Sequence, residues 1–387
     1  MVLSMKKKRI AFLTGTRADY GILKPIMQAI KNSEKFELEL IVTGMHLSQE
    51  FGNSINNIIK DGFEVQHQFE MDTRSDDNIS MAKSVGKGII GAATVLKETF
   101  PDAVIVLGDR TEALAMSISA AYMNIPIIHF SGGDRTGGID ESVRHAITKF
   151  AHIHFPATKE SANRIIKMGE NPKRVFIVGE PSLDKILNLK YMTKEEFSQK
   201  FNINLNKPLI VVIQHANTIE SKDARNQIIK TLNVIKKLRE QTIIIYPNSD
   251  SGGREIIKQI KLCSNLDFIQ VYKNLSHEDY LNLLKYASVL IGNSSSGITE
   301  APSFKLPVVN IGTRQQNRER GINVIDVDYS EKQILEGTNK ALYDKDFQLK
   351  LNKCINPYGN GKTSEKVLEI LTNFDFSKNI LQKINTY

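Results

Sequence analysis

The fold is indicated most directly by two stretches, Val104-Ile-Val-Leu-Gly-Asp-Arg110 and Leu290-Ile-Gly-Asn-Ser-Ser-Ser-Gly-Ile-Thr-Glu300. Each is an apolar run typical of a strand, followed by small and polar residues that begin a helix. The first places Asp109 and Arg110 at the carboxyl end of a strand, where open α/β sheets hold catalytic and binding groups. The second offers serines and backbone N–H groups at a helix start, which suit a phosphate. Together they predict an enzyme that acts on a phosphorylated ligand held between two lobes.

Short apolar runs alternate with helical patterns along the whole chain, which predicts parallel β/α layering. The expected strands of the first half are Arg9–Thr14, Leu38–Thr43, Val104–Leu107, Ile125–His129, Ile153–Pro156 and Val175–Val178. The alternation restarts with Leu209–Ile213, Gln241–Pro247, Phe268–Tyr272, Ser288–Gly292 and Pro307–Ile311. Two separate series predict two doubly wound, Rossmann-like lobes.

The expected domains are 1–187, which carries the acid/base carboxylates, and 188–362, which binds a nucleotide. Between the two strand series lies a polar, Lys-rich connector. Its stretch Thr193-Lys-Glu-Glu196 has the form of a capping box and predicts a short helix. A turn cluster, Asn356-Pro-Tyr-Gly-Asn-Gly-Lys362, precedes a last helix from about Thr363. We expect this segment, 363–387, to cross back to the first domain.

Composition limits the class of protein. The 387 residues are enough for two or three domains, and the formal net charge of +8 suits an anionic small substrate. Basic residues are not interleaved with aromatic ones, so we expect no nucleic-acid partner. Cys263 and Cys354 lack disulfide or metal spacing, which favours the cytoplasm. The basic start lacks a signal-peptide core and no apolar stretch reaches the length of a membrane span, so no membrane partner is expected.

Three familiar patterns are weak in this context. Gly86-Lys-Gly-Ile-Ile-Gly91 matches a dinucleotide motif but lies inside a helical run, which favours close helix packing. Gly361-Lys-Thr363 resembles the end of a P-loop, but Asn356 stands where the loop needs a glycine. A group of three histidines lacks carboxylate and cysteine ligands at metal spacing, so we expect structural hydrogen bonds and no metal cofactor. These are His145, His152 and His154.

The glycine-rich loop Gly132-Gly-Asp-Arg-Thr-Gly-Gly-Ile-Asp-Glu-Ser-Val-Arg-His145 contains more chemistry. It holds Asp134, and it leads into a helix start with Asp140 and Arg144 one turn apart, where they can pair. Asp140 alone could be a helix cap. With Asp109 at another strand end, it predicts two carboxylates that face a common cleft.

In the second half, polar groups also follow the expected strands. His215 lies in Gln214-His215-Ala-Asn217, and Asn248 lies in Tyr246-Pro-Asn-Ser-Asp250. His215 is either a loop residue with a satisfied ring or a ligand of phosphate or ribose. Arg17 and Arg314 come just after strands and suit bidentate contacts with oxyanions.

These segments together resemble the UDP-N-acetylglucosamine 2-epimerase family, in particular its hydrolysing branch. The run Ile139-Asp-Glu-Ser-Val-Arg-His-Ala-Ile-Thr-Lys149 is specific, whereas a two-lobe fold is shared with many glycosyltransferases. The other matching stretches extend over almost the whole chain. They are Thr14-Gly-Thr-Arg-Ala-Asp-Tyr20, Leu107-Gly-Asp-Arg110, Gly132-Gly-Asp134, Gly179-Glu-Pro-Ser-Leu-Asp-Lys185, Gly292-Asn-Ser-Ser-Ser-Gly297 with Glu300, and Asn310-Ile-Gly-Thr-Arg314.

The resemblance implies a GT-B-like architecture, with the nucleotide on the second lobe and the sugar in the cleft. Enzymes of this branch eliminate UDP from UDP-N-acetylglucosamine and hydrate the resulting glycal to free N-acetylmannosamine. By this resemblance Asp109 and Asp140 are the acid/base pair, and Arg144 orients Asp140. The resemblance implies no cofactor. It implies that the protein forms dimers or tetramers.

The resemblance also implies the substrate contacts. His215, which is a catalytic candidate too, would meet the nucleotide or its diphosphate with Arg17 and Arg314. Ser294 and Ser295 would bind phosphate. The remaining expected substrate-binding residues are Glu300, for the ribose hydroxyls, Asp184 and Asn248, which would line the cleft, and Arg110.

One departure bears on the chemistry. The family often has His-x-Glu-Gly-Gly where this chain has His129-Phe-Ser131-Gly-Gly, and a serine cannot act as a general base at neutral pH. Asp134 takes that role, a neighbouring carboxylate suffices, or the sugar differs. A related subgroup acts on 2,4-diacetamido-trideoxy sugars for legionaminic-type acids. The alternatives to an epimerase are a GT-B glycosyltransferase and a catalytically silent nucleotide-sugar sensor.

Overall fold

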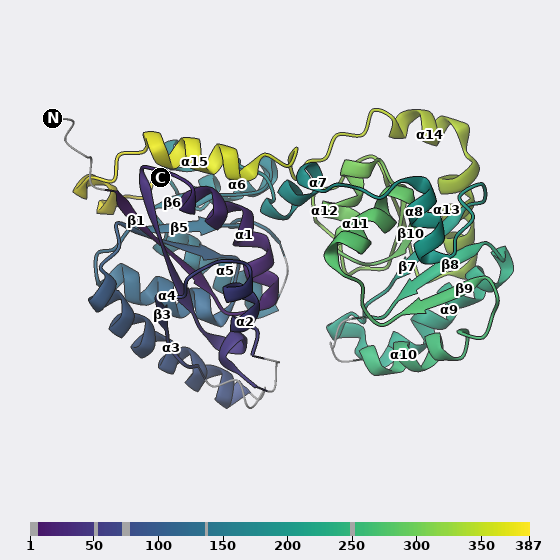
Figure 1. Cartoon of the computed structure of the whole chain (residues 1–387), viewed down its shortest axis with the longest axis horizontal. Coiled ribbons are helices and arrows are strands. Elements are labelled where there is room, and N and C mark those ends of the chain that lie inside the picture. The colour runs from purple at the N-terminus through teal and green to yellow at the C-terminus, as the bar shows by residue number, and fades with distance from the viewer. Residues whose placement is uncertain (1–6, 50–52, 72–77, 136–137, 248–251) are drawn as a thin grey trace. The chain divides into compact units, whose positions relative to one another are not determined.

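The chain forms two compact units in a computed structural model that describes residues 7–49, 53–71, 78–135, 138–247 and 252–387. One unit comprises Met1–Leu187 and Tyr358–Tyr387, and the other comprises Asn188–Pro357 (Figure 1). Each contains a six-stranded sheet whose neighbouring strands are parallel. This confirms the predicted pair of Rossmann-like domains.

The sheet of the first unit has the order β3-β2-β1-β4-β5-β6. Its strands are β1 (Lys8–Thr14), β2 (Phe36–Val42), β3 (His67–Gln68), β4 (Ala103–Leu107), β5 (Ile127–Phe130) and β6 (Ile153–Phe155). Its helices are α1 (Arg17–Lys31), α2 (Ile55–Lys60), α3 (Asn78–Thr99), α4 (Thr111–Tyr122), α5 (Gly138–Phe150), α6 (Lys159–Lys167), α7 (Asp184–Asn188) and α15 (Thr363–Asn373). Short 3-10 turns are η1 (Gly44–Leu47), η2 (Pro172–Arg174), η3 (Pro181–Leu183) and η6 (Lys378–Leu381).

Helices cover both faces of this sheet because successive residues of its strands point to opposite sides. Ile10 and Phe12 pack into a core that takes in α1 and α15, whereas Ala11 and Leu13 pack into a core with α3 and α4. Strand β1 is therefore buried on both faces. A capping box of Thr16 and Asp19 begins α1 directly after β1, so the turn between them is short.

The motif at 86–91 lies inside α3, as expected. A Cβ atom at Gly88 would lie 2.8 Å from Met71 Cε, and one at Gly91 would lie 2.6 Å from a ring carbon of Phe69. These two glycines permit close packing of α3 against Met71 and Phe69. The expectation that no stretch reaches membrane length was wrong: Ile79–Thr99 is long and apolar enough by composition. In this fold, however, α3 contributes Ala92, Val95 and Leu96 to a core of the first unit.

The sheet of the second unit has the order β12-β11-β10-β7-β8-β9. Its strands are β7 (Leu209–Ile213), β8 (Gln241–Ile245), β9 (Ile269–Tyr272), β10 (Val289–Gly292), β11 (Val308–Ile311) and β12 (Val324–Val327). Its helices are α8 (Lys194–Phe201), α9 (Ala224–Leu238), α10 (Gly253–Lys261), α11 (His277–Tyr286), α12 (Ser296–Thr299), α13 (Glu331–Tyr343) and α14 (Lys345–Leu351), with 3-10 turns η4 (Thr218–Asp223) and η5 (Ala301–Phe304). The predicted capping box of Thr193 and Glu196 begins α8.

Two details of the predicted strands need correction. The run at Val175–Val178 is not a regular strand: Val175 makes a parallel bridge to His154, and the N–H groups of Phe176 and Val178 bond the oxygens of His154 and Pro156. Ile177 is 49% exposed, as expected at a sheet edge. Strands β3 and β12 were not expected. Both lie at sheet edges, where strands are short and less apolar.

The chain returns to the first unit at Tyr358, whose backbone oxygen accepts a 2.7 Å hydrogen bond from the N–H of Glu180. Gly179 and Gly359 meet there with φ of +93° and +118°. A Cβ atom at Gly179 would lie 2.8 Å from the Tyr358 oxygen, so this close approach requires glycine. The expected domain boundary at residue 362 falls within the returning segment.

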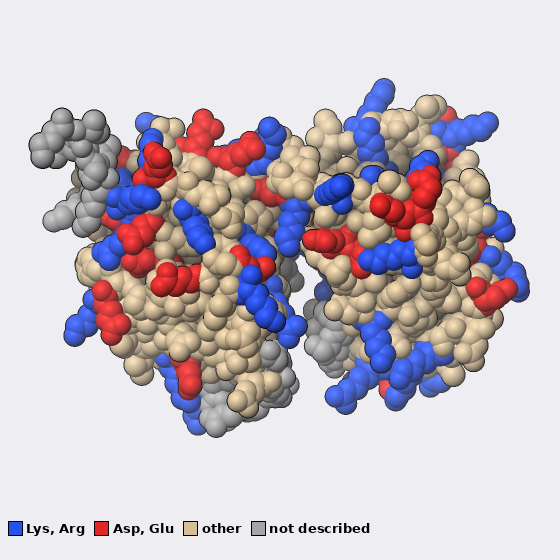
Figure 2. All heavy atoms as spheres, in the orientation of Figure 1, with Lys and Arg blue, Asp and Glu red and all other residues tan. Residues whose placement is uncertain are grey.

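The basic excess is spread unevenly over the visible face. Figure 2 shows Lys and Arg mixed with Asp and Glu over most of both units, with Lys and Arg most frequent along the lower edge of the second unit, where Figure 1 places α10. No continuous basic stripe runs across that face.

Candidate functional site

Each sheet has one point at which the strand order reverses, and the carboxyl ends of the two strands there form the usual ligand crevice of a doubly wound sheet. In the first unit this point lies between β1 and β4, and in the second unit between β7 and β10. Several of the predicted site residues lie at these two places.

In the first unit, Asp109 follows β4 and is ion-paired with Arg144 of α5. Only 20% of the Asp109 side chain and 8% of the Arg144 side chain are exposed. Burial raises the pKa of Asp109; the Arg144 guanidinium opposes this, and the charge of Asp140 adds to the rise. The structure thus brings Asp109, Asp140 and Arg144 together. A carboxylate with a raised pKa is suited to accepting and returning a proton.

Arg144 was expected to pair with Asp140 one helical turn away. The structure shows an ion pair of Arg144 with Asp109. Arg144 is buried, and Asp140 is exposed in the first turn of α5. The pairing of Arg144 with Asp140 stays a prediction.

A carboxylate that was not predicted lies at the same switch point. Glu112 is 5% exposed and holds Arg110 through two hydrogen bonds, from Nε to Oε2 at 3.2 Å and from Nη2 to Oε1 at 3.1 Å. Cβ atoms at Gly15 and Gly44 would each lie 2.8 Å from its side chain. The sequence does show an acidic residue in the first helical turn after Asp109-Arg110, which could have identified Glu112. It does not show that this residue contacts the turn after β1.

The turn after β1 is organised by Asp19. Its carboxylate accepts hydrogen bonds from the N–H groups of Gly15 at 2.9 Å and Thr16 at 2.8 Å. The buried His46 ring bonds Thr14 Oγ1 at 3.0 Å, and burial lowers its pKa, which favours the neutral ring. Arg17 begins α1 with an exposed side chain at this turn, where an anion can reach it.

Asp134 is hydrogen-bonded to α6. It accepts a 2.5 Å hydrogen bond from the hydroxyl of Ser161 in α6, and Arg164 of the same helix bonds the oxygen of Gly133. Ser131 follows β5 and lies in the left-handed region, with φ of +56°. The catalytic role of Asp134 stays a prediction, and its observed contacts are those of a loop anchor.

The three clustered histidines make structural contacts. His152 Nδ1 accepts a 3.1 Å hydrogen bond from the N–H of Ile127, and His154 Nε2 lies 3.1 Å from Glu170. His145 lies 3.7 Å from Glu141 on α5.

In the second unit, Asn293 joins the two strands of the switch point. Its Oδ1 accepts from the N–H of His215 at 2.7 Å, and its Nδ2 donates to the His215 oxygen at 2.9 Å. Gly292 has φ of +134°, and a Cβ atom there would lie 2.0 Å from the oxygen of Ile213. His215 after β7 is thereby fixed beside the serine loop after β10.

The serine loop leads into α12, which has four residues. A helix this short has a weak dipole, so an anion here would depend mainly on N–H groups, hydroxyls and cations. Ser294 Oγ accepts a 3.4 Å bond from the N–H of Ser296, Ser295 is exposed, and Arg314 Nη1 donates to the Asn293 oxygen at 3.2 Å. Arg314 and both serines thus lie at one edge of the sheet.

Glu300 lies at the end of α12 and is 8% exposed. It lies 3.6 Å from His277 Nε2. Burial raises the pKa of Tyr280, and the charge of Glu300 adds to the rise. The Tyr280 hydroxyl is hydrogen-bonded to the hydroxyl of Ser296. A buried carboxylate beside the serine loop fits an acceptor for ligand hydroxyls.

The predicted substrate-binding residue Asp184 makes contacts within the first unit. Asp184 is 2% exposed, and its carboxylate accepts hydrogen bonds from the N–H groups of Thr363 at 2.8 Å and Ser364 at 2.7 Å. It therefore caps the start of α15, a structural contact that differs from the expected place in a cleft. Asn248 lies outside the described residues.

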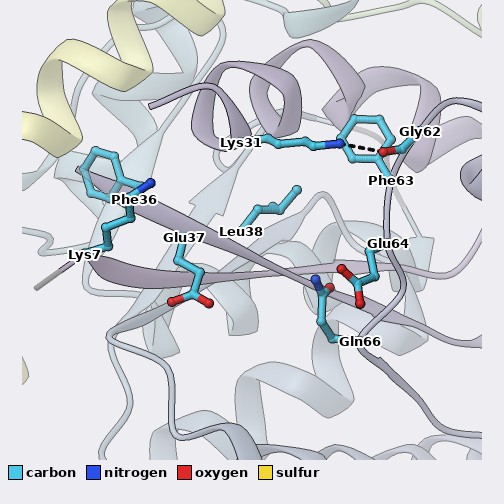
Figure 3. A pocket seen from close by; sticks show the side chains of 9 residues that line it. All are labelled: Lys7, Lys31, Phe36, Glu37, Leu38, Gly62, Phe63, Glu64 and Gln66. Carbon is cyan, nitrogen blue, oxygen red and sulfur yellow. Dashed lines mark hydrogen bonds between the residues drawn. The ribbon is translucent and has the colours of Figure 1, made fainter. Parts of the chain in front are cut away.

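A hollow of about 660 Å³ in the first unit is unrelated to the switch points. Its lining includes Lys31, Phe36 and Phe63, and Lys31 Nζ donates to the Gly62 oxygen at 2.5 Å (Figure 3). Because Phe36 begins β2, the hollow lies at the amino end of the sheet, opposite the ends that carry Asp109.

Solved structures with the same fold were found among epimerases and glycosyltransferases. A UDP-GlcNAc 2-epimerase from Neisseria meningitidis, solved bound to UDP-GlcNAc, matches with a TM-score of 0.79 at 20% identity, over 95% of this chain and 100% of that one. A Rickettsia africae glycosyltransferase matches with a TM-score of 0.58 at 14% identity, over 98% of this chain and 100% of that one. These likenesses establish the GT-B-like fold.

Sequence comparisons are more specific. The profile of the family described as UDP-N-acetylglucosamine 2-epimerase matches residues 28–372. A Legionella pneumophila protein named UDP-N,N'-diacetylbacillosamine 2-epimerase (hydrolyzing) is 39% identical, over 98% of this chain and 100% of that one. A Campylobacter jejuni protein named GDP/UDP-N,N'-diacetylbacillosamine 2-epimerase (hydrolyzing) is 34% identical, over 89% of this chain and 90% of that one. The chain therefore belongs to the UDP-N-acetylglucosamine 2-epimerase family, in its hydrolysing branch.

Proposed function

We propose that the chain is a hydrolysing nucleotide-sugar 2-epimerase, which converts a UDP-linked N-acetylated gluco sugar and water into the free manno sugar and UDP. The observation that carries this proposal is the buried Asp109, ion-paired with Arg144 and close to Asp140 at the β1–β4 switch point of a chain in this family.

The reaction needs a group that takes a proton from C2 and a group that returns one. Loss of the C2 proton and departure of UDP with the electron pair of the C1–O bond leave a glycal with a C1–C2 double bond. Water then supplies the hydroxyl on C1 and the proton on C2, which arrives from the opposite face. Asp109 and Asp140 are the proposed acid/base groups, and the observed ion pair makes Arg144 the residue that orients Asp109.

The departing diphosphate needs positive charge and N–H donors. We assign it to the serine loop with Ser294 and Ser295, to Arg314 and His215 at the same edge, and to Arg17 of the first unit. Glu300 is the proposed ribose acceptor, and Arg110, held by Glu112, is a further substrate contact. Their placement at the two strand ends supports these roles.

For the sugar, we favour UDP-2,4-diacetamido-trideoxy-glucose, the precursor of a legionaminic-type acid, over UDP-N-acetylglucosamine on a sialic acid route. Two observations support this choice: Ser131 replaces the family glutamate, and the two relatives above are named for a diacetylbacillosamine nucleotide. The proposed location is the cytoplasm. The proposed assembly is a homodimer or homotetramer, which the exposed Ile79 and Ile90 on α3, 68% and 71% accessible, would favour.

The test is an isotope experiment with each UDP-sugar. In D₂O the released sugar is expected to carry deuterium at C2, and in H₂¹⁸O it is expected to carry label at C1, with none on UDP. A product with its original C2 hydrogen and gluco configuration would overturn the proposal. Sugar release only after an acceptor is added would indicate a glycosyltransferase, and binding with no turnover would indicate a sensor.

A further inference from the structure

A buried ionic cluster in the first unit has no part in the proposed reaction. We call it the tail cluster; it comprises Lys149, His154, Glu170 and Lys383. Glu170 is 2% exposed, and its oxygens lie 2.7 Å from Lys149 Nζ, 2.7 Å from Lys383 Nζ and 3.1 Å from His154 Nε2. Burial alone would raise the pKa of Glu170, but these three partners lower it to about 2, so the carboxylate is charged.

Lys383 also caps a helix. Its Nζ donates to the backbone oxygens of Thr148 at 3.1 Å, Lys149 at 2.6 Å and Ala151 at 2.6 Å. These oxygens lie at the end of α5, where carbonyls lack partners within the helix and the dipole is negative. A residue near the end of the chain therefore holds the last turn of the helix that carries Asp140 and Arg144.

Hydrogen bonds continue from this cap to the catalytic carboxylate. The hydroxyl of Thr148 lies 3.0 Å from the oxygen of Arg144 and 3.2 Å from His129 Nδ1. His129 Nε2 lies 2.8 Å from the oxygen of Gly108, the residue before Asp109. Because a carbonyl only accepts, Nε2 carries the hydrogen. Burial lowers the pKa of His129 to about 3, so the ring is neutral and Nδ1 can only accept. The Thr148 hydroxyl has one hydrogen, which is shared between the Arg144 oxygen and Nδ1.

We propose that Lys383 is a positioning residue for the Asp109–Arg144 pair. By capping α5, it sets the depth at which Arg144 meets Asp109, and the contacts of Thr148 and His129 hold α5 against the turn after β4. This inference rests on the proposed function for its catalytic part, and it makes the acid/base site depend on the last residues of the chain.

A positioning role and a merely stabilising role predict different pH profiles. The charged groups that act on Asp109 are Arg144, Asp140 and Arg110. If α5 loses its cap, the Arg144 guanidinium stabilises the charged form of Asp109 less. The effects of burial and of the Asp140 charge are then opposed less strongly, and the pKa of Asp109 rises. The acidic limb of the pH profile of kcat, where kcat falls as Asp109 is protonated, then moves to higher pH. Lower stability alone would reduce the amount of active enzyme and leave the limb in place.

The experiment compares Lys383→Met with the unchanged full chain. We expect kcat to fall roughly 10- to 100-fold through misplacement of the pair. We expect KM to stay within about twofold, since none of the proposed nucleotide contacts lies on α5. Lys383→Arg should keep most of the activity. Gln382→Met, at an exposed neighbour, is the matched control and should behave as the unchanged chain.

Two further measurements keep the test decisive. Thr148→Val preserves shape but removes the hydroxyl link, and it should reproduce both the loss of kcat and the shift of the limb if Lys383→Met fails to fold. Hydrogen exchange at the amides of α5 should rise in Lys383→Met and not in Gln382→Met, whether or not the protein turns over a sugar. If the unchanged chain turned over no sugar, only the proposed function would be overturned. Hydrogen exchange at the amides of α5 would still test whether Lys383 caps this helix. Folded Lys383→Met or Thr148→Val with unchanged kcat and unchanged limb would overturn the inference.

Discussion

The side-chain amide of Asn293 bonds both backbone polar groups of His215, its Oδ1 to the N–H at 2.7 Å and its Nδ2 to the oxygen at 2.9 Å. Asn293 is 1% exposed, so water cannot take over these bonds. The relationship fixes the ends of β7 and β10 side by side, where the sheet reverses its strand order.

Asn293→Leu keeps the volume of the side chain and removes both bonds. The N–H and the oxygen of His215 then lose their bonds to Asn293, so we expect the free energy of unfolding to fall by roughly 2–4 kcal/mol and UDP binding to weaken. Urea unfolding and calorimetry measure the two effects. Lys332→Ala, at an exposed position of α13, is the control. A variant as stable as the control would show that this bridge is dispensable.

The acid/base pair is tested by Asp109→Asn and Asp140→Asn, which keep shape but remove a basic oxygen. Turnover should fall by roughly 100-fold or more while the substrate still binds. Release of free sugar by NMR and substrate affinity by calorimetry give the two readouts. Near-normal turnover in either variant would remove that residue from the mechanism.

The serine loop is tested by the double change Ser294→Ala and Ser295→Ala. Each hydrogen bond to a charged phosphate is worth about 1.5–3 kcal/mol, so affinity for UDP should fall at least about tenfold with the fold intact. Calorimetry with UDP measures this, and Ser264→Ala, at an exposed position after α10, serves as control. Unchanged affinity would place the diphosphate elsewhere.

Glu112 is expected to act through Arg110. Glu112→Gln weakens the two hydrogen bonds that hold the guanidinium, so KM for the UDP-sugar should rise about tenfold with a smaller effect on kcat. Steady-state kinetics separate the two constants. Glu98→Gln, exposed on α3, should leave both unchanged. A fall in kcat with KM unchanged would instead assign Glu112 to the chemical step.

Acid should destabilise the first unit through His152. Burial lowers the pKa of this ring to about 4 from an ordinary value of 6.5. The stabilising effect of the neutral ring is complete above pH 6.5 and is lost as the pH falls toward 4, on the order of 2–3 kcal/mol. Urea unfolding between pH 7 and 4 measures the slope. His152→Gln, whose amide oxygen can still accept from Ile127, should show a shallower slope; parallel slopes would contradict the assignment.

Much of the fold was predictable because parallel strands buried on both faces read as plain apolar runs, as β7 does in Leu209-Ile-Val-Val-Ile213. The short edge strand β3 and the partly polar β12 lack that signal. The apolar run at Val175–Val178 has the signal, and it bonds along β6 at the sheet edge without becoming a regular strand.

The site was predictable where chemistry follows a strand end, as with Asp109 and the serine loop. The site was not predictable where the role of a residue depends on a neighbour from another strand. The choice of Asp109 as the partner of Arg144 depends on which face of α5 meets the sheet, and the contact of Glu112 with Gly15 and Gly44 exists only once β1 and β4 are adjacent. Asp184 shows the converse case, because its motif suggested a ligand contact and its carboxylate caps α15.

The return of the chain at Tyr358 also determines the order in which the units can be completed during synthesis. All residues of the second unit, Asn188–Pro357, leave the ribosome before α15 does, so this unit can fold while translation continues. The first unit cannot finish, because Val367 and Leu371 of α15 belong to its core. The half that begins first on the messenger is thus the half that folds last, and its exposed apolar face is what a nascent-chain chaperone would meet.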